Sequence, residues 1–454
     1  MDNKNLPNPP KLKEIIGPSF ILLGLALGSG ELILWPFLAA RHGLGLIWGA
    51  LLGITLQFFL NTEIIRYSLV WGESVFVGFK RLWRWWPVWF IASTFIPWGL
   101  PGFSSASAQI ISRIFGFSQT KWLGIGLLIL TGIILSVGKV LYQTMEYLQR
   151  TIILIGLPMI LILVVLLTGK RDWVDLAQGL IGKGNGFWFF PAGISLGSFL
   201  GAFAYSGAGG NLNLSQSYNV KEKGLGMGKY ADRIVSPWRK KVTKSRLEGR
   251  SFDLTPLNLN KFKKWWRLVT KEHFIVFWGL GFASIVLLSV LAKSLVFGRV
   301  DSQGINFIYQ EAAVIRQTLS PAVGIVFLIV SALMLYATQL GVLESSSRII
   351  SENFILFNWE EGEKANPSKW FYFALWGQIG VGIITLLLGV SEPRFLLTLS
   401  AILNALAMTV LFPLIWVLNK KRLKKELQPS LLRQVVIILG FIFFAVFSAI
   451  TLFS

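Results

Sequence analysis

The sequence predicts an all-α polytopic membrane protein with about eleven transmembrane helices. Apolar runs long enough to cross the hydrocarbon, roughly 20 residues each, recur along the 454-residue chain. Basic residues gather in alternate polar segments between these runs, which is the pattern that orients a membrane protein. The first and the sixth apolar runs also carry glycine-rich interruptions, where a transmembrane helix would lie in the middle of the bilayer.

We expect the apolar runs to form spans one to eleven, in chain order. They lie near residues 17–40, 44–69, 86–112, 121–138, 143–168, 189–214, 273–296, 320–346, 369–390, 393–418 and 430–453. Tryptophan and arginine cluster near several span ends, as is typical of membrane interfaces.

The basic residues favour a cytoplasmic N-terminus and a C-terminus outside the cell membrane, because Lys and Arg are enriched in cytoplasmic loops. This distribution accounts for the net charge of +21 without a nucleic-acid partner. The longest polar segment, residues 217–272, is basic and ends in aromatic residues. We interpret it as a surface anchor on anionic membrane lipid, with a docking site for a regulator as the alternative.

The predicted spans divide the chain into four parts. Residues 1–16 form a cytoplasmic tail, and residues 17–168 form a first half of five helices. Residues 169–418 form a second half of five helices that contains the basic loop 217–272. Residues 419–454 add a basic cytoplasmic linker and an eleventh helix.

The first interruption reads Gly28-Ser29-Gly30-Glu31. Glycine weakens a helix by about 1 kcal/mol relative to alanine, so we expect unwound backbone here. Freed carbonyl groups at such a break suit a cation. Glu31 has two interpretations, a carboxylate that caps the second half-helix and an ionisable group that holds a cation or a proton.

The second interruption reads "YSGAGGNLNLSQS" and begins at Tyr205. Its three glycines are followed by Asn211 and Asn213. Broken spans at matching positions of two halves indicate the binding site of a secondary transporter. We therefore expect an inverted repeat of five plus five helices, with the eleventh helix appended.

These stretches resemble the Nramp family of divalent metal transporters. The similarity includes the Gly17-Pro18 entry into span one, the break within it, and an acidic-x-x-Arg pattern that leads to Gly72-Glu73. The resemblance implies the amino-acid-polyamine-organocation type of transporter fold. It also implies a divalent metal cation as the transported substrate.

The chain departs from the Nramp pattern at the metal site itself. The family carries Asp-Pro-Gly-Asn in its first span, where this chain has glycine, serine and Glu31, and the methionine of its sixth span is absent. Oxygen ligands favour hard cations over thiophilic ones. By this resemblance the ligands would come from seven positions: Gly28, Glu31, Gly207, Asn211, Asn213, Gln339 and Asn404.

The sequence therefore predicts a secondary-active transporter of a divalent cation that works by alternating access and is coupled to a proton or an ion gradient. No ATPase motif and no cofactor are expected, and the two histidines and absent cysteines argue against an enzyme. Two alternatives stay open: a transporter of a small organic solute such as an amino acid, and a membrane sensor or scaffold that transports nothing.

Charged pairs at helical spacing are expected within three spans. They are Glu63 with Arg66, Glu146 with Arg150, and Glu344 with Arg348. Residues three or four apart share one helix face, so we interpret each as a structural or gating pair.

Overall fold

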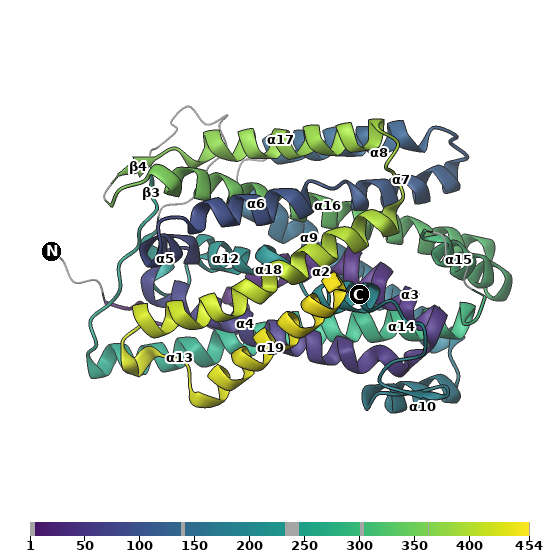
Figure 1. The fold of residues 1–454 in the computed structure, drawn as a ribbon, viewed down its shortest axis with the longest axis horizontal. Coiled ribbons are helices and arrows are strands. Elements are labelled where there is room, and N and C mark those ends of the chain that lie inside the picture. The colour runs from purple at the N-terminus through teal and green to yellow at the C-terminus, as the bar shows by residue number, and fades with distance from the viewer. Residues whose placement is uncertain (1–4, 138–140, 232–244, 300–303, 362, 454) are drawn as a thin grey trace.

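The computed structural model describes residues 5–137, 141–231, 245–299, 304–361 and 363–453. Residues 1–4 of the predicted tail and 232–244 of the predicted basic loop lie outside the described residues, as do residue 138 of span four and the last residue of the chain. Figure 1 shows an elongated bundle whose helices run mostly along its long axis.

Nine helical stretches in the described residues are long and apolar enough to cross a membrane. They are Pro18–His42, Leu44–Trp71, Thr120–Val137, Gln143–Leu167, Pro256–Val296, Pro321–Asn358, Pro367–Leu387, Pro393–Arg422 and Leu431–Phe453. They correspond to spans one, two, four, five and seven to eleven. In the described residues, spans three and six are each built from shorter helices in series.

The first half of the bundle holds spans one to five. Its helices are α1 (Leu12–Ile15), α2 (Pro18–Ala26), η1 (Leu27–Leu34), α3 (Trp35–His42), η2 (Leu44–Leu46), α4 (Ile47–Trp71), α5 (Val75–Leu82), α6 (Trp86–Trp98), α7 (Gly102–Phe115), α8 (Thr120–Val137) and α9 (Leu141–Leu167). Span three is divided into α6 and α7 because Pro97 and Pro101 remove helical hydrogen bonds there.

A linker and the sixth span follow. The linker contains α10 (Lys170–Leu180) and an antiparallel hairpin of β1 (Lys183–Gly184) and β2 (Phe187–Trp188). Span six consists of α11 (Leu196–Ala204), η3 (Gly210–Leu214) and α12 (Ser215–Lys223), followed by η4 (Gly226–Tyr230). This span therefore begins and ends later than the predicted range 189–214. Proline at 191 and glycine at 193 delay its start to Leu196.

The remaining elements complete the second half and the appended helix. They are β3 (Ser245–Arg246), α13 (Pro256–His273), η5 (Phe274–Leu280), α14 (Gly281–Val296), α15 (Asn306–Thr318), α16 (Pro321–Asn358), β4 (Lys364–Ala365), α17 (Pro367–Leu387), α18 (Pro393–Arg422), η6 (Lys425–Leu427) and α19 (Leu431–Phe453). Strands β3 and β4 pair with each other. Several of these helices begin at a proline, whose fixed φ suits the first helical position.

Within the described residues of the basic segment 217–272, the part that directly precedes span seven is helical. Helix α13 continues through η5 into α14 without interruption. The apolar run alone predicted a start near residue 273, but the Thr255 side chain caps the helix N-terminus and Pro256 occupies its first position. Helix α13 buries Phe262, Trp265 and Val269 on one face, which explains why it is helical.

Burial separates the centre of the bundle from its lipid-facing flank. Every residue in the most apolar window of span one is buried, whereas only 22% of that window in α19 is buried. Helices α9 and α19 expose rows of leucine, isoleucine and valine. Such large exposed apolar surfaces are stable in lipid, so the chain is an integral membrane protein.

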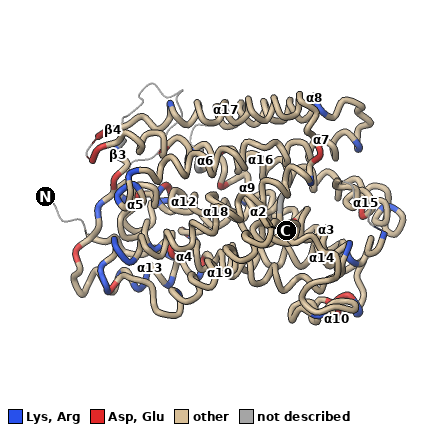
Figure 2. Tube along the Cα trace, in the orientation of Figure 1, with Lys and Arg blue, Asp and Glu red and all other residues tan. Residues whose placement is uncertain are grey.

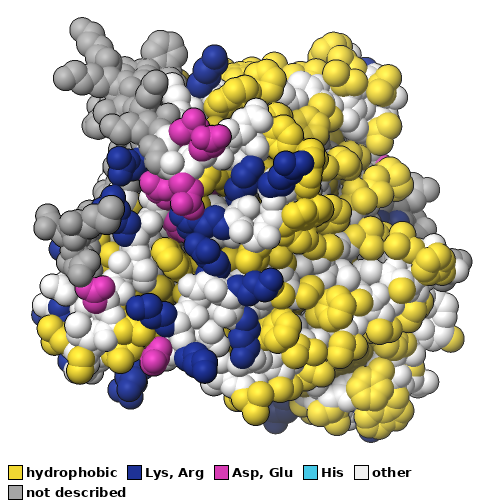
Figure 3. Space-filling model, turned by 60° about the vertical axis from the view of Figure 1, so that its left-hand side comes forward, with side chains coloured by type: hydrophobic (Ala, Val, Ile, Leu, Met, Phe, Trp, Pro, Cys, Tyr) yellow, Lys and Arg dark blue, Asp and Glu magenta, His cyan; other side chains and the backbone are white. Residues whose placement is uncertain are grey.

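Lys and Arg gather at the end of the bundle formed by α5, α12 and α13 (Figure 2), which we call the basic end. Figure 3 shows charged side chains toward this end and hydrophobic side chains over the neighbouring flank.

Candidate cation site

Span one is interrupted by a widened helix, not by the unwound backbone expected from its glycines. Residues Leu27–Leu34 form the π-helix η1, in which the Trp35 amide donates to the Gly30 carbonyl five residues earlier. π-Helical turns are rare and often mark functional sites. The expected freed carbonyls are therefore partly satisfied in span one, and its break differs in kind from that of span six.

Span six contains a true break between α11 and η3. The chain leaves helix geometry at Tyr205 and resumes it at Gly210, and Gly209 and Gly210 have φ angles of +75° and +52°. Glycine adopts such angles without steric cost. A Cβ atom on Gly210 would also meet the Asn404 amide of α18, so only glycine fits this approach.

The two interruptions touch each other at the centre of the bundle. A Cβ atom on Gly30 would meet the backbone carbonyl oxygen of Tyr205. The Trp35 indole donates to the Ser206 hydroxyl over 3.0 Å, which ties α3 to the break in span six. The predicted meeting of spans one and six is thus present in the structure.

Glu31 lies in η1 and is completely buried. The Ser284 hydroxyl of α14 donates a hydrogen bond to its Oε2 atom. Its Oε1 atom has no hydrogen-bond partner among the described residues. A Cβ placed on Gly281 would lie 3.6 Å from Oε1, so the backbone of span seven passes close to this oxygen.

Gln57 of α4 fills the break in span six. Its amide nitrogen donates to the Ala204 carbonyl over 3.0 Å, and its amide oxygen accepts from the Gly209 backbone and from Asn213. A Cβ on Gly207 would meet the same Gln57 oxygen. Gln57 therefore holds Ala204, Gly209 and Asn213 in place from span two.

The other predicted ligands point toward several neighbouring spans. Asn211 donates to Ser93 and Thr94 of α6 over 2.8 and 3.0 Å. Asn404 donates to the Tyr205 hydroxyl over 3.0 Å. Gln339 accepts from the Ser104 backbone, and Gly28 donates to Thr338 on the same helix α16.

The predicted ligands therefore surround the paired interruptions without forming one cage in this conformation. No hydrogen bond between described residues joins Glu31 to Asn211, Asn213, Gln339 or Asn404. Within the described ranges, no three acidic or histidine side chains come together as a metal site. A cation here would depend on Glu31 together with amide and backbone oxygens.

The interruptions contain a surplus of buried acceptor oxygens. Among the described residues, the side-chain oxygens Glu31 Oε1, Asn211 Oδ1, Asn213 Oδ1 and Asn404 Oδ1 have no hydrogen-bond donor. A buried acceptor without a donor destabilises a protein by about 1–3 kcal/mol. A cation satisfies several such oxygens at once, and carboxylate and amide oxygens suit hard divalent ions.

The sequence interpretation assigned no site role to four of these residues. Gln57, Ser284 and Thr338 contact the interruptions from spans two, seven and eight. Tyr205 begins the second interruption and accepts from Asn404. Gln57 carried a signal, because an amide in an apolar span requires a partner. A hydroxyl carries none, since serine and threonine in a span can bond their own helix.

Ion pairs close the bundle at the basic end. Arg348 of α16 contacts Glu344 on its own helix and Glu222 of α12, the latter over 3.3 Å. The predicted pairs Glu63–Arg66 and Glu344–Arg348 are confirmed. The predicted pair of Glu146 with Arg150 is wrong.

Glu146 instead pairs with Lys223 of α12 over 2.8 Å. It faces α12 across the bundle, where the lysine at the end of span six reaches it, whereas Arg150 is exposed. Tertiary packing thus overrides the favourable spacing within the helix.

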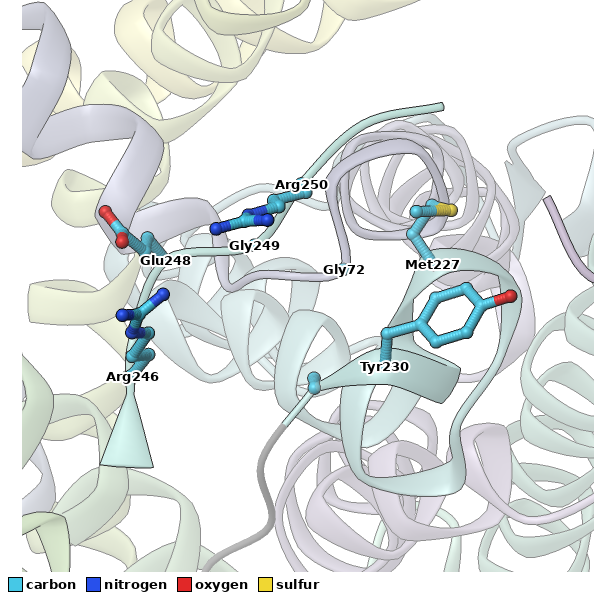
Figure 4. A pocket seen from close by; sticks show the side chains of 8 residues that line it. Gly72, Met227, Tyr230, Arg246, Glu248, Gly249 and Arg250 are labelled. Atoms are coloured by element: carbon cyan, nitrogen blue, oxygen red, sulfur yellow. The ribbon is translucent and has the colours of Figure 1, made fainter. Parts of the chain in front are cut away.

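A cavity of about 240 Å³ opens at the basic end, away from Glu31. It is lined by residues of η4, the end of α4 and the segment after β3: Gly72, Met227, Tyr230, Ala231, Arg246, Glu248, Gly249 and Arg250. Figure 4 shows Arg246 and Glu248 on one side and Met227 and Tyr230 on the other. Beside it Glu73 is buried, which raises the pKa of its carboxyl although Arg81 opposes the shift.

The chain folds as an all-α polytopic membrane protein whose first and sixth spans are interrupted. The structure superposes on a point mutant of the Eremococcus coleocola manganese transporter with a TM-score of 0.70, at 15% identity, over 98% of this chain and 88% of that one. A complex of the same transporter with an aromatic bis-isothiourea compound gives 0.70 at 14% identity, over 99% and 89%.

A more distant likeness is to MhsT in complex with L-phenylalanine. Its TM-score is 0.53 at 13% identity, over 96% of this chain and 97% of that one. No protein-family model matches the chain, and no curated protein matches its sequence. At these identities the structures establish a common fold, which confirms the predicted fold class and, at the level of fold, the resemblance to Nramp transporters. Both of these solved proteins share this fold.

Proposed function

We propose that the protein is a secondary-active transporter that moves a divalent metal cation across the cell membrane by alternating access. The two five-helix halves, residues 17–168 and 169–418, would move relative to each other around the interruptions of spans one and six. The basic end would face the cytoplasm, because Lys and Arg favour that side. A proton or ion gradient would supply the energy.

One observation carries this proposal: the unpartnered Oε1 atom of Glu31. A carboxylate buried at the centre of a membrane bundle is costly unless it is neutralised or binds a cation. Glu31 also lies where span one touches the break of span six. The fold shared with a manganese transporter supports a metal substrate.

The unpartnered oxygens at and beside the paired interruptions support a hard cation. They are carboxylate and amide oxygens, which suit Mg²⁺, Ca²⁺ and Mn²⁺ better than thiophilic metals. We therefore propose Mn²⁺ or Mg²⁺ as the substrate.

The test is uptake by proteoliposomes that contain the purified chain. Mg²⁺, Mn²⁺, Ca²⁺, Fe²⁺ and a mixture of amino acids are offered separately. We expect Mn²⁺ or Mg²⁺ uptake, reduced at least about tenfold by Glu31→Gln, which keeps the shape and removes the charge. Glu14→Gln, an exposed carboxylate on α1, is the matched control and should transport normally.

A second candidate substrate is a small organic solute. It is favoured by the fold shared with MhsT, whose structure holds L-phenylalanine. Amino-acid uptake without cation uptake in the same experiment would favour this candidate. Specific ligand binding without any uptake would instead indicate a sensor or scaffold.

A further inference from the structure

A second buried polar cluster joins spans one and seven at the basic end. Ser19 lies in the first turn of α2, and Glu272 and His273 are the last two residues of α13. The Ser19 hydroxyl donates to Glu272 Oε2 over 2.5 Å and lies 2.7 Å from His273 Nδ1. Ser19 and His273 are completely buried, and Glu272 is 4% exposed.

The bridging hydroxyl makes the cluster able to take up one proton. When Ser19 donates to an ionised Glu272, it can only accept from Nδ1–H of a neutral His273. A proton that binds His273 Nε2 allows the Nδ1 proton to pass to Ser19, whose own proton passes to Glu272. The net change is one added proton, carried as a neutral carboxylic acid and an Nε2–H imidazole.

Two atoms of the cluster are available to bind the added proton. His273 Nε2 and Glu272 Oε1 are buried and have no hydrogen-bond partner among the described residues. The imidazole ring is nearly parallel to Phe277, at 4.6 Å and 6°, and to Phe58, at 5.6 Å and 16°. These rings fix the imidazole plane, and an aromatic face also favours a transient cation.

Few charged side chains of the described residues lie near the cluster. The positive charge of Lys223 on α12 favours the ionised form of Glu272, but Lys223 is paired with Glu146 of α9. Helix α4 presents Phe58 to the cluster. The other nearby charges on α1 and α13 are exposed to solvent: Lys11, Lys13, Glu14 and Lys271. Beside the cluster, the partly buried charges of Glu146 and Lys223 neutralise each other.

The cluster and Glu31 occupy the same two spans but do not touch. Ser19 precedes Glu31 by about 18 Å along span one at 1.5 Å per residue. Between them the π-helix η5 directly follows His273, and it packs against α2. Gly281, which follows η5, lies beside Glu31. A change in the packing of η5 would thus reach the cation site.

We propose that Ser19, Glu272 and His273 form a proton-binding site, distinct from the cation site at Glu31, that loads and releases the coupling proton of the transport cycle. The proposal rests on the proposed function as far as coupling is concerned. Proton binding itself can be tested without transport.

The first experiment observes His273 directly. The chain has only two histidines, so His42→Gln in the full chain leaves one imidazole for ¹⁵N nuclear magnetic resonance in lipid nanodiscs. We expect the His273 ring nitrogens to change tautomer or charge once between about pH 5 and about pH 9. Glu272→Gln should move the midpoint by at least about one pH unit toward acid. A spectrum that stays constant over this range in the folded protein would overturn the proposal.

The second experiment tests coupling in proteoliposomes with a pH-sensitive dye inside and a Mn²⁺ gradient across the membrane. Glu272→Gln and His273→Gln should keep Mn²⁺ uptake within about threefold of the wild type and lose at least about 90% of Mn²⁺-driven proton movement. Glu14→Gln and His42→Gln should keep both. Proton movement that persists in both cluster variants overturns the proposal, as does wild-type Mn²⁺ uptake that moves no protons. A wild type that carries no cation contradicts the proposed function instead, and the resonance experiment still decides on the proton site.

Discussion

Gly30 shows at the scale of one residue how closely the two interruptions pack. Its α-carbon faces the Tyr205 backbone carbonyl, which cannot move aside as a flexible side chain would. We expect Gly30→Ala to lower the free energy of unfolding by about 1–3 kcal/mol, as overpacking of a core does. It should also reduce cation uptake, because the added methyl group would displace the backbone next to Glu31.

The matched control is Gly377→Ala on α17, where an added Cβ has open space. It should be neutral or stabilising by up to about 1 kcal/mol, because alanine favours a helix. Thermal unfolding of both variants in detergent provides the comparison. Equal behaviour of the two alanine variants would mean that the interruptions are loosely packed.

Glu311 on α15 gives a pH-dependent prediction outside the spans. Burial raises the pKa of its carboxyl to about 8. An acid whose pKa is raised by folding stabilises the folded state fully below its unfolded pKa, and this stability is lost as the pH rises through the folded pKa. The wild type should therefore lose up to about 1.4 kcal/mol of stability per pH unit between about pH 4 and about pH 8.

Glu311→Gln removes this titration. Melting temperatures of wild type and variant should agree near pH 4 and diverge toward pH 9, with the variant more stable at the higher value. Parallel melting curves across that range would show that Glu311 is accessible to water in the native protein.

At the scale of elements, Glu63 connects three helices. Its carboxylate accepts from Arg66 on α4, from Arg433 on α19 over 3.1 Å, and from Asn419 on α18 over 3.1 Å. Glu63→Gln would leave the buried Arg66 and the partly buried Arg433 without their anion, which destabilises by about 3–5 kcal/mol. Arg433→Gln leaves the pair of Glu63 with Arg66 intact, so it should lower the free energy of unfolding by clearly less than Glu63→Gln does.

Thermal unfolding and hydrogen exchange of residues 431–440 measure these effects. Exchange should increase in both variants, because α19 is held to α4 by Arg433. If Arg433→Gln destabilises as much as Glu63→Gln, the contact between α19 and α4 contributes more than the charge balance at Glu63.

Elements were predictable where one physical cause dominated. Apolar runs predicted the positions of most spans. The start of α13 was not predictable from hydropathy, because its caps and one buried face, rather than apolar length, make Pro256–His273 helical. Whether glycines unwind a span or widen it to a π-helix depends on the neighbouring spans, as η1 shows.

At the scale of the whole molecule, the sequence predicted which spans form the site. It did not predict which neighbouring spans the polar side chains of the site contact. The expectation that spans one and six carry the site follows from Gly30, Glu31, Gly209 and Gly210, whose sequence pattern is unusual for a helix. The orientation of Asn211 toward span three and of Asn404 toward Tyr205 depends on long-range packing. No local pattern in the chain encodes such contacts.

The central claim is that a divalent cation binds at Glu31 between the interruptions of spans one and six. The most direct measurement is anomalous X-ray diffraction from crystals of the full chain soaked with Mn²⁺. The account predicts an anomalous peak within about 2.5 Å of a Glu31 carboxylate oxygen, and its loss in Glu31→Gln. An anomalous peak at another site with none at Glu31, in a protein that transports Mn²⁺, would contradict it.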